Sequence, residues 1–456
     1  MHAHIQGDRF SGCHFSIIRL MTCRNGKARI IPFGTAAMLV LLSVTGAIMA
    51  APTPTFAGEF VSPALTLNAA ADLAVASQPL LEAQRSAVSG AQEAAVAAAQ
   101  LPDPMLVGGV ADLTLTGADR FTLQDTDTQF MFGVKQIFPG GKKRELRGMR
   151  GQVESDRLDT EFEDQIRIVR RETGLAWLDI WKAQQALDLV QGSSLEAQRQ
   201  FELVEINYRA GRATQADISA ARVEIELLQD QVAGLQQQEW QARNRLRRWI
   251  GDDADRPIRP DLPQWPEPEL AALLGQLERH PNIAAQGKAV EVASADLKLA
   301  REDYRPDWSI QVGYGYRPEF ADMVSVQFET ALPFFTRNRQ DRTVQAHAAD
   351  VRRAELLWED ALRQYRAALT LNVTDWQRSQ QRLQRFDAVI LPQSQQRLDA
   401  ALAVYGAGGG LLLGILDARR SLLDVRMQRL EVEFDSARDQ VQLQYFSDVT
   451  PEEAQP

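Results

Sequence analysis

Four short segments in the first half of the chain recur, in the same order, in the second half. Gln78–Gln84 resembles His280–Gln286, Leu101–Pro104 resembles Arg305–Trp308, Phe138–Gly140 resembles Leu332–Phe334, and Tyr208–Gly211 resembles Tyr405–Gly408. The four offsets are 202, 204, 194 and 197 residues, so order and spacing are nearly kept. A regular offset is typical of a duplicated unit. We therefore expect two copies of one unit of about 200 residues.

Each copy is expected to contain a helix, two strands, a long helix, a turn and a last helix. The expected helices cover 66–100, 142–207 and 214–249 in the first copy, and 267–303, 337–404 and 411–446 in the second. In both last helices, apolar residues recur at alternating spacings of three and four, which is typical of coiled-coil packing. These residues are Ile218, Ala221, Ile225, Leu228, Val232 and Leu235 in one helix, and Leu423, Met427, Leu430, Phe434, Ala437 and Val441 in the other.

The N-terminal part reads as a secretion signal. Arg24, Lys27 and Arg29 precede a compact apolar run at 36–51, and small residues at Thr55 and Ala57 follow it. The run is shorter than the about 20 residues that a membrane-spanning helix needs, although an uncleaved anchor is the alternative. We expect residues 1–57 to be signal peptide and preceding segment. The rest divides into a first repeat (58–250), a linker (251–266), a second repeat (267–446) and a polar tail (447–456).

Charge and cysteine content exclude several classes of protein. The net charge is −10, which disfavours nucleic-acid binding. Residues 1–57 hold five basic residues and one acidic residue, so cleavage leaves 45 basic against 59 acidic, a net of −14. Both cysteines, Cys13 and Cys23, lie in that segment, so a disulfide or a thiolate metal site is not expected. No later apolar run approaches 18 residues, so any membrane segment would be built from strands.

Alternating apolar residues predict four strands, at 105–115, 130–138, 308–316 and 324–332, each about 10–12 residues long. In the first of them, Met105, Val107, Gly109 and Ala111 are expected on the apolar face. One apolar face and one small or polar face is typical of an outer-membrane barrel, and also of a soluble sandwich. The secretion signal favours the barrel, as do aromatic residues where strands meet helices. These are Tyr304, Trp308, Phe334 and Phe335.

The number of strands sets the expected assembly. Four strands cannot close a barrel, and open edges are not tolerated in lipid. Eight strands leave an interior filled by side chains, whereas twelve strands from three chains leave a passage. We expect 214–249 to stack on 267–303, and 411–446 on 66–100, beside two long helices, giving a tunnel of twelve helical columns. The expected fold is mostly α: a trimeric 12-stranded transmembrane barrel, four strands per chain, continued by a coiled-coil periplasmic tunnel.

Residues 66–446 resemble the TolC-type outer-membrane efflux proteins, most of all the CzcC-like heavy-metal branch. The most telling segments are Leu101–Pro104, Arg305–Tyr314 and Leu332–Gln340. The resemblance implies a trimeric exit duct in the outer membrane of a Gram-negative bacterium, with a periplasmic extension. It also implies a periplasmic adaptor (membrane fusion protein) and an inner-membrane pump of the resistance-nodulation-division type as partners, besides outer-membrane lipid. Drugs or type I protein secretion are alternatives to heavy-metal cargo, and a periplasmic coiled-coil scaffold or adaptor without a pore is the rival class.

The resemblance also places a gate at the periplasmic end, made by rings of Asp after each helix-to-helix turn. The turns are expected to contact the adaptor through Tyr208 and Gly211, and through Tyr405 and Gly408. In the second copy the two gate positions hold Gly414 and Asp417, so one acidic ring is missing there. The first copy offers Asp217 at the position that matches Gly414.

Nothing in the sequence predicts catalysis, a cofactor or a metal site. His280 and His347 are the only histidines after residue 57, and they lie far apart in the chain. His280 precedes Pro281, where the first copy has Gln78, so a helix-start role is expected for it. The glycine run at 406–410 follows a helix and lacks the Lys-Ser/Thr ending of a phosphate-binding loop. Four basic residues after the second strand are expected either to contact lipid headgroups or to form a solvated helix face: Lys142, Lys143, Arg144 and Arg147.

Overall fold

The structure is a computed structural model that describes residues 64–118, 120–122, 125–407 and 409–447. The expected signal segment with both cysteines, Gly408 and the tail beyond residue 447 lie outside these residues. The described residues belong to one compact unit, Val61–Pro456, in which both expected repeats take part.

Long helices dominate this unit, and they are longest where the sequence lacks breaks. The helix α3 runs for 67 residues, which is about 100 Å at 1.5 Å per residue. A π-helical turn at Phe386–Ile390 joins α7 to α8, just before Pro392, whose missing N–H disturbs the regular pattern. The α-helices are α1 (Leu67–Ser77), α2 (Pro79–Ala98), α3 (Lys143–Arg209), α4 (Gln215–Ile250), α5 (Leu270–Gln276), α6 (Pro281–Glu302), α7 (Gln340–Arg385), α8 (Leu391–Gly406) and α9 (Leu412–Phe446).

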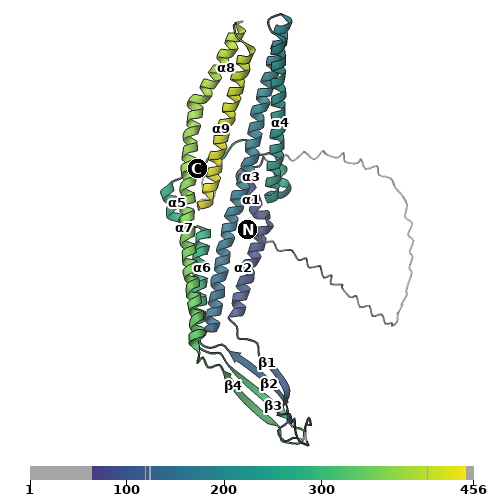
Figure 1. Ribbon diagram of the computed structural model, residues 1–456, viewed down its shortest axis with the longest axis vertical. Coiled ribbons are helices and arrows are strands. Elements are labelled where there is room, and N and C mark those ends of the chain that lie inside the picture. The colour runs from purple at the N-terminus through teal and green to yellow at the C-terminus, as the bar shows by residue number, and fades with distance from the viewer. Residues whose placement is uncertain (1–63, 119, 123–124, 408, 448–456) are drawn as a thin grey trace, which may run out of the picture. The chain divides into compact units, whose positions relative to one another are not determined.

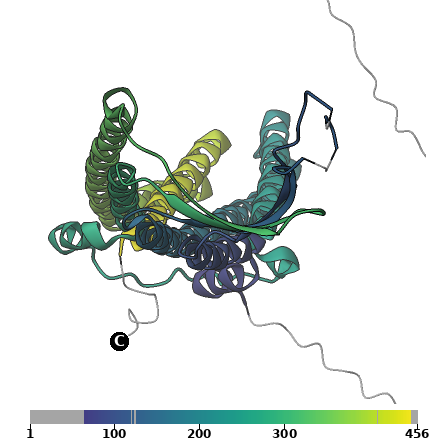
Figure 2. The same cartoon turned by 90° about the horizontal axis from the view of Figure 1, so that it is seen from below.

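The helices form four columns that lie side by side (Figures 1 and 2). Near the strands the order across the layer is α2, α3, α6 and α7, and toward the other end it is α4, α3, α9 and α8.

The expected stacking of short helices is wrong. The helix α4 lies end to end with α1 and α2, and α9 with α6, so each column is completed within its own half of the chain. Tight turns hold α4 against α3 and α9 against α8, and α9 is in line with α6 because both pack between α3 and α7. The heptad residues of α4 and α9 are buried or half-buried, as predicted.

Two of the predicted helices are broken, at matching places. The segment 66–100 divides at Gln78-Pro79, and 267–303 divides at His280-Pro281. In both, the residue before proline is extended and the proline takes the first helical position, where its missing N–H costs nothing. The imidazole of His280 also caps α6, since its Nδ1 accepts from Asn282 N–H at 3.2 Å.

Two buried tryptophans fix the irregular segments to the middle of α3. The indole N–H of Trp177 donates to the carbonyl of Leu65 at 3.0 Å, and that of Trp181 to the carbonyl of Pro260 at 2.6 Å. Leu65 in turn forms a parallel bridge with Ile258 of the linker. Buried indole N–H groups need such partners. The chain before α1 and the linker after α4 therefore share one core, at mid-length of α3.

The strands form one antiparallel sheet in the order β1-β2-β3-β4, at one end of the helical columns (Figure 1). Two strands are shorter than predicted, β1 with 7 residues and β4 with 8, whereas β2 with 10 and β3 with 9 lie where they were predicted. The first strand ends before Leu113 because Asp112 has a φ of +57°, which breaks the extended backbone. Their bounds are β1 (Met105–Ala111), β2 (Gln129–Phe138), β3 (Trp308–Tyr316) and β4 (Met323–Thr330).

We predict that Trp177→Phe will lower the free energy of unfolding by about 1–3 kcal/mol, because it removes a buried hydrogen bond and leaves a cavity. Urea denaturation followed by circular dichroism measures the loss. The same change at Trp240, which is 66% exposed on α4, is the control and should alter it by less than about 0.5 kcal/mol. Equal losses would contradict the placement of Trp177 in the core.

Candidate functional site

One face of the sheet is apolar and exposed from edge to edge. In its middle, Leu106, Val134, Val312 and Val326 lie opposite one another across all four strands. All four are exposed, Leu106 by 84% and Val326 by 71%. The neighbouring rows add aromatic side chains, Phe132 beside Tyr314 and Ile310 beside Phe328. A soluble protein rarely exposes so continuous an apolar surface, which marks contact with a membrane or a partner.

The register corrects the predicted face of β1. Val107 is opposite Gly133, and Met105 is opposite Lys135, so both lie on the polar side of the sheet. Leu106 and Val110 take the apolar side instead. Both sets of alternate residues in β1 contain apolar side chains. Only the pairing with β2 decides which set lies on the apolar face, because a shift of one residue in register exchanges the two faces.

The other face of the sheet is small and polar. Gly133 and Gly313 lie opposite each other, and a Cβ on Gly133 would lie 2.7 Å from the carbonyl oxygen of Val312. Lys135 of β2 forms an ion pair with Glu329 of β4 across the strand between them. Apolar and polar faces of this kind match the lipid-facing and interior faces of a transmembrane barrel. Within the described residues, the outer edges of β1 and β4 have no strand beside them.

The sheet meets the helices through glycine, proline and one buried lysine. Gly140 passes so close to the second half of the chain that a Cβ would lie 2.2 Å from the carbonyl oxygen of Pro306. Its N–H donates to Asp307 at 2.8 Å, and the ammonium of Lys143 contacts Asp307 at 2.9 Å and Asp303 at 3.3 Å. Lys143, which the sequence placed at a headgroup or in solvent, therefore binds the two halves together.

The four predicted interface aromatics divide into two kinds. Trp308 is half-buried and stacks on Phe138, with 4.3 Å between ring centroids, and the hydroxyl of Tyr304 donates to Asp341 at 2.5 Å. Phe334 and Phe335 are instead exposed by 76% and 88%. All four lie in or beside the junction of strands and helices.

The two helix-to-helix turns lie together at the end of the columns farthest from the sheet (Figure 1). Tyr208 is exposed, and Gly211 after it has a φ of +71°, which favours glycine. In the second turn, the hydroxyl of Tyr405 accepts from the side-chain amide of Asn207 at 3.4 Å, which links both turns. Gly408 lies outside the described residues.

The two predicted gate carboxylates have different surroundings. Asp217 accepts from the N–H of Thr214 at 2.8 Å and completes a capping box at the start of α4. Asp417 is exposed and forms no ion pair with a described residue, because its neighbour Arg420 pairs with Glu224 of α4. Glu224 is almost fully buried. This pair was not predicted, since a carboxylate beside a heptad position normally faces solvent.

A second acidic group, also missed, lies on α9 nearer mid-length of the columns. Asp439 is half-buried, and burial first, then the like charges of Asp375 and Asp435, raise its pKa to about 6. Arg438 opposes this shift in part. Asp439 therefore changes charge in a pH range where ordinary carboxylates stay ionised.

Of the two histidines in the described residues, His280 is buried and His347 is half-buried. His280 lies in a buried cluster with Tyr365 and Tyr445, and its Nε2 is 2.9 Å from the carbonyl of Tyr445. His347 lies 3.8 Å from Asp350 on α7. Across the part of the chain that the structure describes, His, Cys, Asp and Glu nowhere gather in threes as metal ligands would. None of the helices described is long and apolar enough to cross a membrane.

Comparison with known proteins identifies the class. The pattern of the family described as outer membrane efflux protein matches residues 275–446. The cobalt-zinc-cadmium resistance protein CzcC of Cupriavidus metallidurans is 26% identical over 86% of this chain and 91% of its own length. Solved structures of CusC and of VceC from Vibrio cholerae each have a TM-score of 0.70, with 17% and 18% identity, over 83% of this chain and 90% and 94% of theirs.

The exposed apolar sheet and the helical columns thus define an outer-membrane protein with a periplasmic extension. Its similarity to outer membrane efflux proteins covers residues 275–446 by the family pattern and most of the chain by the relative CzcC. Its relatives are channels rather than enzymes.

We predict that Leu106→Arg will sharply reduce insertion into the outer membrane, since an arginine near the middle of a lipid-facing strand costs about 2–4 kcal/mol. Folding yield into lipid vesicles measures this cost. Val107→Arg, one residue along on the polar face, should insert nearly as well as the wild type. If Val107→Arg were the more damaging change, the register of β1 would be wrong.

We further predict that Asp439 lowers stability as pH rises. Its pKa is higher in the fold than its ordinary value of 3.8, so the folded state holds the proton more tightly. Stability is therefore lost as pH rises from about 4 through about 6. Asp439→Asn should melt at a higher temperature than the wild type at pH 8, and at a similar temperature at pH 4. Asp424→Asn, at an exposed position of α9, should leave the pH dependence unchanged.

Proposed function

We propose that three copies of this chain form a 12-stranded barrel and a helical tunnel below it. The observation that carries the proposal is the four-stranded sheet with an exposed apolar face and two unpaired edges. Open edges cannot remain in lipid, so β1 of one copy must pair with β4 of the next. Two copies would close eight strands around a filled interior, whereas three leave a passage.

The function that follows is an exit duct of a tripartite efflux pump of the resistance-nodulation-division type. Helical columns on the periplasmic side end in two exposed turns, and such tips suit contact with a periplasmic adaptor that leads to an inner-membrane pump. A coiled-coil scaffold without a pore would have no use for an exposed apolar sheet, so that rival is not favoured.

The two halves, 58–250 and 267–446, are proposed to descend from one duplicated unit, with 251–266 as their linker. They share the order of helices and strands, and both break their first helix before a proline, Pro79 and Pro281.

The cargo is proposed to be heavy-metal cations. The support is the relative CzcC, whose name links it to cobalt, zinc and cadmium and nearly all of whose length this chain covers. Two pyoverdine export proteins called OpmQ are 25% identical over little more than half of this chain, so they give weaker support to another cargo.

From the proposed assembly, we expect the protein to be a trimer that conducts ions. Native mass measurement in mild detergent should give three chains, and the same sample should form pores in a planar lipid bilayer. A monomer or dimer, or a trimer without conductance, would contradict the proposed duct.

At the narrow end, three copies of Asp417 are proposed to converge and favour cations, as rings of acidic side chains do in other channels. The exposed carboxylate without an ion pair supports this. Asp417→Asn should weaken cation preference and relieve block by divalent cations. Asp424 lies one heptad along the same helix, about 10 Å away, so Asp424→Asn is a matched control that should do little. If Asp417→Asn and Asp424→Asn had equal effects, ion selectivity would be set along the tunnel wall instead of at its narrow end.

The proposed cargo predicts the phenotype of a deletion strain. Loss of the gene should increase sensitivity to cobalt, zinc or cadmium salts and leave sensitivity to drugs nearly unchanged, with complementation by the wild-type gene as the control. Sensitivity to drugs alone would exclude the metal cargo but retain the duct.

A further inference from the structure

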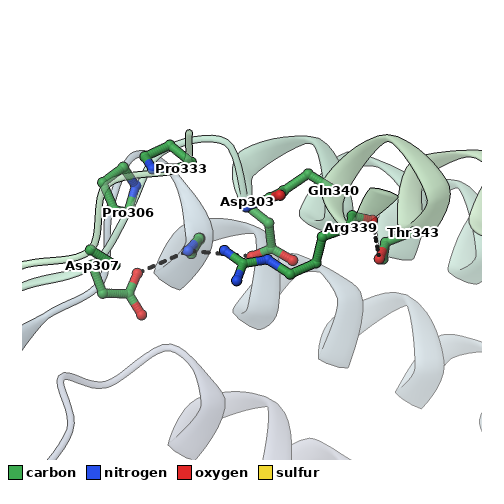
Figure 3. A pocket seen from close by; sticks show the side chains of 9 residues that line it. Asp303, Pro306, Asp307, Pro333, Arg339, Gln340 and Thr343 are labelled. Carbon is green, nitrogen blue, oxygen red and sulfur yellow. Dashed lines mark hydrogen bonds and ion pairs between the residues drawn. The ribbon is translucent and has the colours of Figure 1, made fainter. Parts of the chain in front are cut away.

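A cavity of about 340 Å³ opens where the second half of the chain passes from sheet to helix (Figure 3). This volume lies within the range of sites for small ligands. It is lined by the first residue of α3, the turns that follow α6 and β4, and the start of α7. These are Lys143, Asp303, Pro306, Asp307, Ala331, Pro333, Arg339, Gln340 and Thr343.

The cavity contains charges of both signs. Lys143, whose side chain is 8% exposed, contacts both Asp303 and Asp307, so two carboxylates share one ammonium. Arg339 extends toward them along the cavity in Figure 3, and its guanidinium forms no ion pair with a described residue. Asp307 also accepts from the N–H of Gly140 and is influenced by the charge of Arg147, so Asp303 and the guanidinium of Arg339 are the charges left for a ligand.

A buried acceptor in the wall also lacks a donor. Gln340 is 7% exposed, and its Oε1 is buried without a hydrogen-bond partner among the described residues. Leaving a buried acceptor unsatisfied costs about 1–3 kcal/mol, which a ligand donor would recover. Gln340 is also the first residue of α7, whose N-terminus has no side-chain cap. The free N–H groups of a helix N-terminus attract anions, phosphate above all.

The chain beside the cavity exposes apolar side chains that suit contact with a membrane surface. Leu332, Phe334 and Phe335, which alternate with or follow lining residues, are exposed by 63%, 76% and 88%. They lie where the apolar sheet ends and the periplasmic helices begin. A headgroup in the cavity would therefore leave its acyl chains beside exposed apolar side chains.

We propose that this cavity binds the headgroup of a zwitterionic phospholipid that carries a primary ammonium, as phosphatidylethanolamine does. The phosphate is held by Arg339 and the N-terminal N–H groups of α7. The ammonium donates to Gln340 Oε1 and to the carboxylates of Asp303 and Asp307. This inference rests on the proposed membrane duct, and it names a lipid partner at the junction.

The test measures lipid retention by the delipidated, detergent-solubilised protein, using native mass measurement with short-chain phospholipids. Phosphatidylethanolamine should bind at least about tenfold more tightly than phosphatidylcholine, which has no N–H to donate, and than phosphatidylglycerol, which has no cation. Inorganic phosphate should not displace it at equal concentration. Equal binding of the three lipids would overturn the proposal, and displacement by phosphate alone would show a free-phosphate site instead.

Two variants locate the site. Arg339→Gln and the nearly isosteric Gln340→Leu should each weaken phosphatidylethanolamine binding by about tenfold, and Arg339→Lys should keep part of it. Arg342→Gln, on the exposed side of the same turn, is the matched control and should bind like the wild type. Unchanged binding in both site variants, with the oligomer intact, would reject the cavity. Because lipid retention and ion conductance are separate measurements, failure of this site is distinguishable from failure of the duct.

Discussion

The unpaired edges of the sheet are the constraint on which the rest of the molecule depends. An apolar face favours lipid, but lipid offers no partner for the free N–H and C=O groups along β1 and β4. The sheet is therefore an incomplete part of a larger surface. Each strand also continues into one helical column, since β1 follows α2, β2 leads to α3, β3 follows α6 and β4 leads to α7. The number of strands in the closed barrel therefore sets the number of helical columns below it.

Because each strand continues into one helical column, the junction must accommodate the difference between the spacing of strands and the spacing of helices. Strands lie about 4.8 Å apart, and a tilt of about 40° raises their spacing around a barrel to about 6 Å. Packed helices need about 8–10 Å. The columns must therefore spread as they leave the strands. Gly140 and Gly141, with a φ of +60° at Gly141, let the chain turn sharply there, while Lys143 holds the spreading halves together.

The sequence predicted what depends on local pattern and missed what depends on pairing between distant segments. The strand β3 was found to the residue because bulky residues from Trp308 to Tyr316 alternate with small or polar ones. The predicted apolar face of β1 was wrong because Met105, Leu106 and Val107 are all apolar, and only the pairing with β2 sets the register. The helix break before Pro79 was missed, whereas the helix-start role of His280 before Pro281 is confirmed. The buried Glu224, by contrast, carries no local signal, since its burial depends on Arg420 nearly 200 residues away.

The two tips of the helical columns are fixed by different interactions. The start of α4 has a complete capping box, in which Thr214 and Asp217 satisfy each other's backbone N–H groups. The start of α9 has no side-chain cap, and Leu411 just before it is 80% exposed. The start of α9 is held by burial instead, since Leu412, Ile415 and Leu416 are 2%, 0% and 2% exposed, whereas the first residues of α4 are exposed. The first tip is therefore fixed by hydrogen bonds at its helix start and the second by apolar burial, and the ion pair of Arg420 with Glu224 ties α9 to α4 beside them.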